Sequence, residues 1–393
     1  MPWRASSPMS LRLEFVLEAL RARTTFADLC ARYGVSEKTG YKWRARFLAG
    51  GPDALRDRSH APHTCPHHMP ARLEALLWAE RHAHPTWGAR KLRARLLAAH
   101  PADAWPAPST LTASLVRAGL VVPRPRRAHA AHPAFPLTVP VEPNDVWSVD
   151  FKGEFRTGDG RYCYPLTVMD GATRALLACR ARLRIDGAET RSSFHRLFQR
   201  HGLPRVIRSD NGTPFAGPGL RGLSRLSVWW CRLGIRPERI HRGCPQENGA
   251  HERMHRTLKA DTTRPPRAHC RAQQRCFDAF RHEYNTERPH EALGLVPPAT
   301  RYAPSPRPYS PVLAPLEYPA HYERRRVGSS GHFRWRSRST FLTKSLAGED
   351  IGLAPVDGEH WLAYFGPQLL GQFTPHTGAF LELAHLPPID EPN

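Results

Sequence analysis

The chain has 393 residues, 40% of them hydrophobic, which is enough for roughly two to four domains with cores of their own. No apolar run approaches the roughly 20 residues that span a bilayer. The eight cysteines have no regular spacing, which argues against a disulfide scaffold and for a reducing cytoplasm. The formal net charge of +22 comes mainly from arginine, whose planar guanidinium suits phosphate, so a polyanion is the expected partner.

Residues 10–58 have the pattern of a helix-turn-helix DNA-binding domain. Thr25 and Ser36 are predicted helix N-caps, and Gly34 between them provides a tight turn. The second helix of such a motif enters the major groove. Four basic residues of this helix are expected to contact DNA: Lys38, Lys42, Arg44 and Arg46. The alternative is a helical hairpin whose basic face is simply solvated.

Helical spacing returns in residues 70–122, where a Pro-rich bend precedes a last helix with Ser109 as its predicted N-cap. The closing Leu-Val-Val is expected to be a short wing or strand, so the sequence predicts a second, winged helix-turn-helix module. Residues 123–145 contain too many prolines to fold and are expected to be a linker.

A Pro-rich stretch before this second module holds four residues of metal-ligating type: His63, Cys65, His67 and His68. They lack the paired ligand spacing of known zinc sites, so a structural zinc is not favoured.

Residues 140–295 change to alternating strands and helices, which predicts a layered α/β domain. In the segment VWSVDF, Trp147 and Val149 are expected on the buried face and Asp150 on the polar face. Two further strands are expected antiparallel to it, after which helices alternate with two more strands.

Residues 297–320 are a second Pro-rich linker, and residues 322–388 contain short strands with frequent turn signals. This pattern predicts a small β-barrel DNA-binding domain. Its Arg334, Arg336 and Arg338 are expected on a strand that faces DNA.

Two carboxylates have distinctive places in the α/β domain. Asp150 lies in the first strand, and Asp210 lies at the carboxyl end of a buried strand, where active sites collect in such sheets. A third carboxylate on a nearby helix would complete a set of hard oxygen ligands for Mg²⁺ or Mn²⁺. Two such ions can activate a hydroxyl and stabilise the leaving oxygen in phosphodiester chemistry.

The third carboxylate is either Glu247 or Glu252. At 3.6 residues per turn, four polar residues form one stripe of the predicted helix: Glu252, His255, Arg256 and Lys259. If the helix extended backward, Glu247 would project beside Met254 and Leu258 and be buried without a partner. Glu247 is therefore predicted in the loop before Asn248, and Glu252 is the predicted metal ligand.

The motifs "WSVDFKG", "SDNGTPF", "PQENGAHERMHRTLK" and "YNTERPHEALGLVPP" together resemble the integrase-like core of bacterial insertion-sequence transposases, which are related to retroviral integrases. The resemblance implies an RNase H-like fold with an Asp-Asp-Glu site, matched here by Asp150, Asp210 and Glu252, and two divalent metal ions. It also implies a basic residue seven positions after the glutamate, which is Lys259. With Arg256, it is expected to bind the DNA strand.

The implied function is that of a transposase, which binds the ends of a mobile DNA element and catalyses metal-dependent cleavage and strand transfer. Its implied partners are the double-stranded ends, the target DNA and further copies of itself, in a bacterial cytoplasm at the nucleoid. The likeness covers nearly the whole chain. One departure is the spacing, since 41 residues separate Asp210 from Glu252, several more than is usual in that family. We attribute it to a longer loop at residues 216–226, which proteins tolerate.

Two rival functions remain open. A transposase-derived regulator without catalysis would bind DNA only, but it would gain nothing from three carboxylates beside phosphates. An RNase H-like nuclease would cut without joining, but it would not need DNA-binding modules on both sides of its core.

Overall fold

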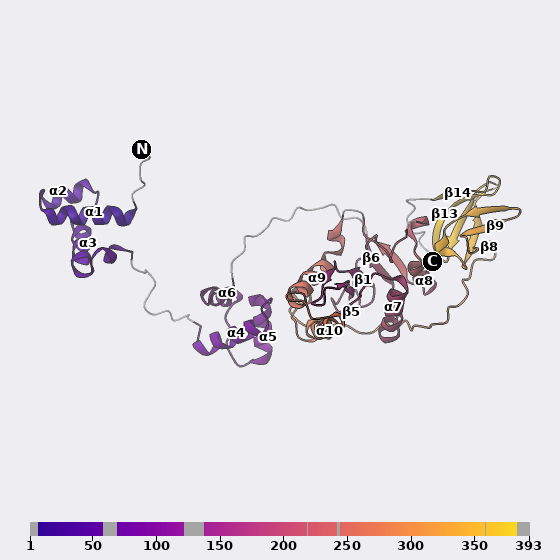
Figure 1. Ribbon diagram of the computed structural model, residues 1–393, viewed down its shortest axis with the longest axis horizontal. Helices are drawn as coiled ribbons and strands as arrows, with labels where there is room; N and C mark the ends of the chain where they lie inside the picture. The colour runs from indigo at the N-terminus through magenta and orange to yellow at the C-terminus, as the bar shows by residue number, and fades with distance from the viewer. Residues whose placement is uncertain are drawn as a thin grey trace. The chain divides into compact units, whose positions relative to one another are not determined.

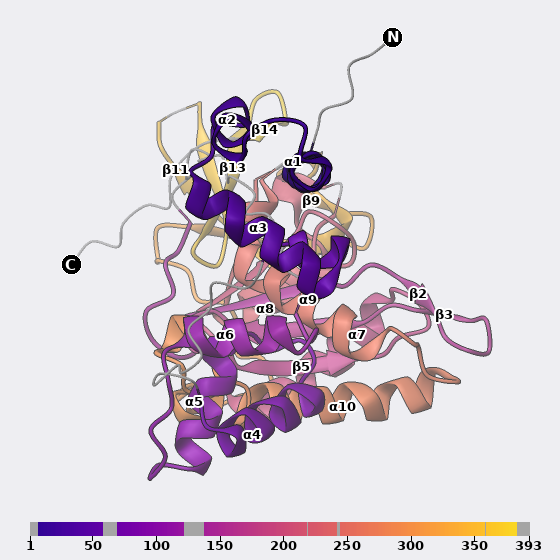
Figure 2. The same ribbon diagram turned by 90° about the vertical axis from the view of Figure 1, so that its left-hand side faces the viewer.

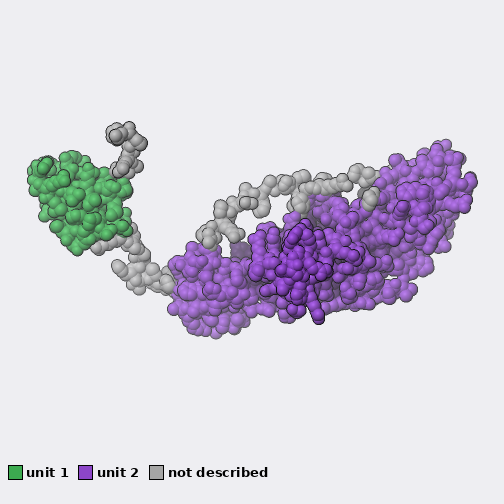
Figure 3. Space-filling model, viewed as in Figure 1, with its two compact units in different colours: residues 1–68 green, residues 69–393 purple. Residues whose placement is uncertain are grey.

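The computed structural model describes residues 7–57, 69–121, 137–217, 219–241, 244–357 and 359–382. The chain forms two compact units, residues 1–68 and 69–393 (Figure 3). No described helix is long and apolar enough to cross a membrane. The tract with His63 and its neighbours lies outside the described residues, as does most of the stretch predicted as the first linker.

The first unit is a three-helix domain with α1 (Pro8–Arg21), α2 (Phe26–Arg32) and α3 (Glu37–Gly50), followed by the short helix η1 (Pro52–Leu55). Its N-caps are the predicted ones: Thr25 accepts a hydrogen bond from the Asp28 N–H, and Ser36 accepts one from the Thr39 N–H. Gly34 turns the chain with φ of +66°. A shared apolar core holds the three helices together: Phe15, Val16, Leu29, Cys30, Trp43 and Leu55.

The second unit begins with three helices, α4 (Ala71–Ala83), α5 (Ala89–Ala99) and α6 (Pro108–Arg117). They close around fully buried side chains that include Leu77, Trp87 and Leu92. The predicted N-cap of the last helix is wrong. Helix α6 begins two residues earlier than that cap implies, with Pro108 at its first position, which suits the fixed φ of proline, so Ser109 lies inside the first turn. Of the expected wing, Leu120 and Val121 are described and form no strand.

A five-stranded mixed sheet in the order β5-β4-β1-β6-β7 forms the centre of the second unit. Its strands are β1 (Val146–Phe151), β4 (Leu166–Asp170), β5 (Leu176–Arg180), β6 (Val206–Ser209) and β7 (Arg236–Arg239). Strand β1 pairs antiparallel with β4 and parallel with β6. A small hairpin of β2 (Phe155–Arg156) and β3 (Tyr162–Cys163) extends between β1 and β4.

Helices cover both faces of this sheet (Figures 1 and 2). On one face α7 (Gly187–His201) and α8 (Arg225–Arg232) pack on Trp147 and Val149 of β1. On the other, α9 (Gly249–Thr262) and α10 (Cys270–Thr286) pack on β4, β5 and the hairpin. The predicted layered α/β domain is confirmed, as is the alternation of β1.

The segment after α10 contains η4 (Glu291–Leu293) and η5 (Pro298–Thr300) and then runs over α7, where Tyr302, Tyr309 and Leu313 pack against the sheet core. The expected linker is therefore partly built into the α/β domain.

A C-terminal group of strands follows, in a five-stranded sheet of order β14-β13-β12-β11-β8 and a two-stranded sheet of β9 and β10. The strands are β8 (Glu323–Arg326), β9 (His332–Trp335), β10 (Arg338–Phe341), β11 (Asp350–Pro355), β12 (Trp361–Phe365), β13 (Gln368–Thr374) and β14 (Ala379–Glu382), with η6 (Lys344–Leu346) between β10 and β11. A single bridge between Val327 and Phe333 links β8 toward β9. Because these sheets do not close, the predicted β-barrel is not confirmed, although the all-β character is.

Candidate active site and nucleic-acid interface

Asp150 and Asp210 lie at the same end of the central sheet. Ser148 of β1 pairs in parallel register with Arg208 of β6, and each aspartate is two residues beyond its paired position. Asp210 follows the last residue of β6, and its Oδ1 accepts a hydrogen bond from the Gly212 N–H at 3.1 Å within the tight turn. Two carboxylates at the carboxyl ends of neighbouring parallel strands are thus fixed by sheet register.

Helix α9 brings Glu252 to this end of the sheet. The short helix η3 (Pro245–Asn248) leads into α9, whose N-cap is Asn248, and Glu252 lies in its first turn with an exposed side chain. Burial first, then the nearby charge of Asp210 and, more weakly, that of Glu252, raise the pKa of Asp150 to about 7. Asp210 and Glu252 are therefore each close enough to act on the charge of Asp150. Among the described residues, however, no three His, Cys, Asp or Glu side chains are already gathered as a metal site.

Glu247 is occupied by another interaction. Its Oε2 accepts the backbone N–H of His241 at 2.7 Å, and its Oε1 lies 2.9 Å from Nδ1 of the same histidine. The carboxylate is thereby held in the short helix η3, ahead of α9, rather than in the predicted loop. Glu252 has no hydrogen-bond partner in the described part of the chain, so its oxygens are available to a ligand.

Two buried histidines on α9 were not recognised as structural from the sequence. His251 and His255 both place Nε2 at 2.7 Å from the Thr167 hydroxyl of β4, and His251 Nδ1 lies 2.8 Å from Ser148 Oγ. The same Thr167 hydroxyl is 3.0 Å from the carbonyl oxygen of Asp150. These contacts hold α9 against β1 and β4, and they thereby fix the position of Glu252 relative to the sheet.

The predicted exposed stripe of α9 needs one correction. His255 is 7% exposed, because the face that carries Met254 and Leu258 toward the core also carries the i,i+4 pair of histidines. Burial lowers the pKa of His251 to about 3 and that of His255 to about 2, so both rings are neutral. His255 Nδ1 is 3.6 Å from Asp150 Oδ2, and a neutral ring there adds no positive charge to the carboxylates. Arg256 and Lys259 are exposed, as expected.

In the first unit, the predicted DNA-contacting residues lie on α3. Lys38, Lys42 and Arg46 follow one another at i,i+4 spacing and so share one face of the helix. Arg44 projects from another side, where its guanidinium lies 6.0 Å from the ring centre of Tyr41 and 5.9 Å from that of Phe26. Lys38, Lys42 and Arg46 therefore form one basic stripe of α3, and Arg44 lies on a different side of the helix.

Known protein families match both parts of the chain. A helix-turn-helix domain family matches residues 11–63, and a homeodomain-like family matches residues 39–115. Two integrase core domain families match residues 140–245 and 233–298. The predicted resemblance and the predicted core are thus confirmed.

Individual relatives come from mobile elements and retroviruses. A protein of insertion element IS407 from Burkholderia multivorans is 28% identical over 42% of this chain and 57% of its own length. A protein of insertion element IS476 from Xanthomonas euvesicatoria is 31% identical over 40% of this chain and 44% of its own length. The chain thus spans about half the length of these relatives. The Gag-Pol polyprotein of baboon endogenous virus is 29% identical over 50% of this chain and 11% of its own length.

Among solved structures, the HTLV-2 integrase catalytic core domain in complex with magnesium aligns with 41% of this chain and 98% of its own. The two are 15% identical, with a TM-score of 0.31.

Proposed function

We propose that this chain, which is similar to bacterial insertion-element proteins and matches helix-turn-helix and integrase core domain families, is a transposase. It would bind the ends of a mobile DNA element and catalyse metal-dependent cleavage and strand transfer. The observation that carries this proposal is the placement of Asp150 and Asp210 at one end of neighbouring parallel strands, with Glu252 near enough for its charge to raise the pKa of Asp150.

The residues at this cluster fit divalent cations. Burial and the charges of Asp210 and Glu252 raise the pKa of Asp150, and the imidazole of His255 beside it is neutral, so a cation would balance negative charge at this site. Carboxylate oxygens are ligands suited to Mg²⁺ or Mn²⁺, and Asp150, Asp210 and Glu252 would hold two such ions. When bound, the ions would supply an activated hydroxyl and charge stabilisation for the leaving oxygen.

Other residues of the chain would bind and position the DNA. Arg256 and Lys259 follow Glu252 along α9 by one and two turns, so they would position the strand that enters the carboxylate cluster. On α3, the face with Lys38, Lys42 and Arg46 would enter the major groove of an element end, and Arg44 would contact the flanking backbone.

The C-terminal strands would add sequence-independent contacts to the duplex. Three arginines on β9, β10 and the turn between them are exposed: Arg334, Arg336 and Arg338. A basic strand edge of this kind binds phosphates. Copies of the chain would assemble on the paired ends and on target DNA.

The test is strand transfer with Mg²⁺ on duplexes taken from the DNA that flanks the gene. Asp150→Ala, Asp210→Ala and Glu252→Ala should each lower cleavage and joining by at least about a thousandfold, because each removes a ligand from a site worth several kcal/mol. DNA binding should stay intact. Strand transfer by Asp210→Ala at the wild-type rate would refute the assignment, and cleavage without joining by the wild type would indicate a nuclease.

Glu247→Gln is the matched control for the choice of glutamate. Its carboxylate is engaged by His241, so activity should stay within several-fold of wild type. A complete loss of activity in this variant with normal activity in Glu252→Gln would reverse the choice.

A further inference from the structure

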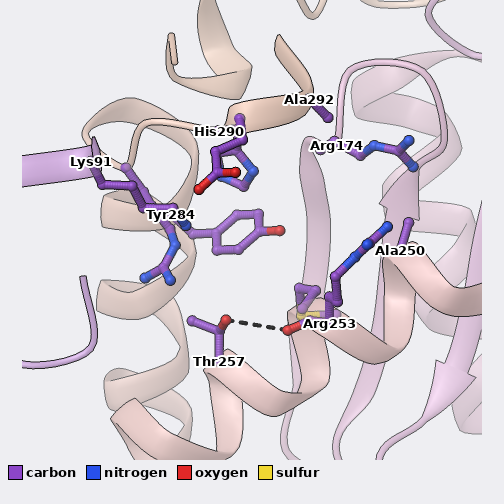
Figure 4. A pocket seen from close by; sticks show the side chains of 11 residues that line it. Lys91, Arg174, Ala250, Arg253, Thr257, Tyr284, His290 and Ala292 are labelled. Atoms are coloured by element: carbon purple, nitrogen blue, oxygen red, sulfur yellow. Dashed lines mark hydrogen bonds between the residues drawn. The ribbon is translucent and has the colours of Figure 1, made fainter. Parts of the chain in front are cut away.

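A basic cavity of about 330 Å³ lies on the second unit where four segments meet (Figure 4). Lys91 enters from α5, Arg174 from the turn between β4 and β5, and Arg253 from α9. Tyr284 and His290, from the end of α10 and the segment after it, lie between them in Figure 4. Several of the lining residues belong to the motif "YNTERPHEALGLVPP", for which the sequence alone predicted no role in binding or catalysis.

The positive charge around this cavity is largely unbalanced. Arg288, which also lines it, is 3.7 Å from Asp261 and lies over the Trp87 ring. The lining carboxylate, Glu291, is 3.5 Å from Arg90. Lys91, Arg174 and Arg253, in contrast, form no hydrogen bond or ion pair through their side chains with the described residues. Three cations thus face one cavity without anions of their own.

Holding these cations together costs free energy in the ligand-free protein. Burial and, to a smaller extent, the charge of Arg288 lower the pKa of Lys91 to about 8, although the charges of Glu291 and Asp261 act in the opposite direction. Burial and the charge of Arg253 likewise lower the pKa of Arg174. An anion in the cavity would reverse these effects, because it stabilises the charged form of each group.

Neutral hydrogen-bond donors complete the site. Burial lowers the pKa of His290 to about 3, so its ring is neutral, and its buried Nε2 has no hydrogen-bond partner among the described residues. The His290 ring packs edge-on against Tyr284, with 4.6 Å between the ring centres. A buried polar atom without a partner is uncommon in folded proteins, and here it marks a place for a ligand oxygen.

We propose that this cavity is a phosphate site and that its occupant is a backbone phosphate of the DNA strand held beside Glu252. Arg253 is the next residue of α9 after Glu252, so the same helical turn serves the cavity and the carboxylates, and a DNA strand at the carboxylates would bring its phosphates near the cavity. Two guanidinium groups and an ammonium group from three segments match the several oxygens of a phosphate, whereas one arginine satisfies a planar carboxylate. The assignment to DNA rests on the proposed function.

The site also links two modules to one point on the DNA. Lys91 belongs to the helical module of residues 69–121, and Arg174 and Arg253 belong to the integrase core. A phosphate contacted by both the helical module and the integrase core would fix where the DNA lies relative to the carboxylates. Small displacements of the DNA there lower the reaction rate steeply.

The salt dependence of DNA binding tests this proposal on the full-length protein. Each phosphate contact contributes about 0.9 to the slope of log affinity against log salt. If Lys91, Arg174 and Arg253 share one phosphate, the triple variant Lys91→Gln/Arg174→Gln/Arg253→Gln should reduce the slope by about 0.9 on a short mixed-sequence duplex. Three separate contacts would reduce it by about 2.7, and that result would overturn the proposal, as would no change.

Single variants provide the controls. Arg253→Gln changes an exposed side chain, so it should fold even if the triple variant does not, and it should weaken DNA binding by about tenfold. Arg253→Lys should recover part of that loss. Arg271→Gln removes the same charge from an exposed site on α10, roughly 20 Å along the helix from Tyr284, and should leave the slope unchanged. Equal effects of Arg271→Gln and Arg253→Gln would refute a specific site.

Inorganic phosphate tests whether the cavity binds a free anion or a backbone phosphate of DNA. Phosphate should raise the Tm of the wild type and of Arg271→Gln, but not that of the triple variant, because only the first two retain the site. If the triple variant loses this response while its DNA slope is unchanged, the cavity binds a free anion and the DNA assignment is wrong. Both measurements report binding alone, so they hold even if Asp210→Ala proves active and the proposed catalysis fails.

Discussion

Glu247 and Glu252 lie five residues apart in one motif, but their surroundings differ. Both oxygens of Glu247 are engaged by His241, whereas Glu252 projects from the first turn of α9 with no hydrogen-bond partner in the described chain. A carboxylate already satisfied by the protein gains little from a metal ion, and an unsatisfied one beside two aspartates gains much. Hydrogen bonding at single residues thus supports the choice made from helix geometry.

The two cations that follow Glu252 on α9 should act on rate more than on affinity. Lys259→Ala should slow the single-turnover rate by about tenfold or more, since a displaced strand reacts slowly, while many arginines elsewhere keep the duplex bound. Arg256→Ala should act in the same direction but more mildly. Measuring the rate and the Kd of each variant checks this, and a weaker Kd with an unchanged rate would make Lys259 an ordinary surface contact.

His201 should make the stability of the second unit depend on pH. Its ring, at the end of α7, lies 3.2 Å from the Tyr302 hydroxyl and lines a cavity with Arg200, Arg281 and His282. Burial, with the charges of Arg200 and Arg281, lowers its pKa to about 4. Because the pKa of His201 in the folded protein is below its unfolded value near 6.5, the neutral ring contributes fully to the free energy of unfolding above about pH 6.5. As the pH falls toward 4, the free energy of unfolding should decrease by on the order of 2 kcal/mol.

The variant His201→Gln cannot take up this proton, so its stability should fall less between those pH values. Denaturant unfolding of both proteins at a series of pH values measures the difference, which should be constant above pH 6.5. Equal pH slopes for the two proteins would show that His201 does not titrate as described.

At the scale of elements, the approach of α3 to its neighbours depends on Gly40. A Cβ at this position would lie 2.7 Å from Cys30 Sγ and 2.9 Å from the Phe15 ring, closer than side chains pack. Gly40→Ala should therefore destabilise the first unit by about 1–3 kcal/mol and displace the basic face of α3. Thermal unfolding and end-specific DNA binding measure the two effects. Gly88→Ala, where a Cβ meets nothing within 4 Å, is the control and should alter neither.

The longer loop before α8 has a packing role of its own. Within residues 216–226, η2 (Leu220–Gly222) and Leu223 join the apolar core of the C-terminal strands, and Ser345 donates a hydrogen bond to the Leu223 carbonyl at 2.8 Å. The additional residues between Asp210 and Glu252 therefore connect the integrase core to the C-terminal sheet. This accounts for the spacing without disturbing either carboxylate.

At the scale of the whole molecule, recognition of the element ends should reside mainly in the helical modules that precede the integrase core. A chain that lacks residues 1–68, the first compact unit, should lose most of its preference for the end sequence over a scrambled duplex. A chain that begins at residue 137 should lose the rest. Both should still bind DNA in a strongly salt-dependent way, because phosphate contacts remain. Competition binding at fixed salt is the measurement, and full discrimination by the shorter chain would contradict the prediction.

The sequence by itself determined most of the elements and the residues proposed for chemistry. Caps at Thr25 and Ser36, the alternation of β1 and the helical period of α9 are local signals, so they could be interpreted without the fold. The start of α6 was misplaced by two residues because proline at the first helical position competes with a serine cap. The β-barrel could not be settled from strand patterns, because closure depends on pairing between edge strands distant in sequence.

Only the tertiary structure decided what packs against the predicted site. Burial of His255, and its shared contact with His251 on Thr167, follow from how α9 lies on the sheet, which a helical period alone does not specify. The basic cavity gathers Lys91, Arg174, Arg253 and His290 from segments up to about two hundred residues apart. Each of these looks in the sequence like an ordinary charged or polar residue. The function proposed for them follows only from the fold, which brings like charges together at a free-energy cost that a bound anion would offset.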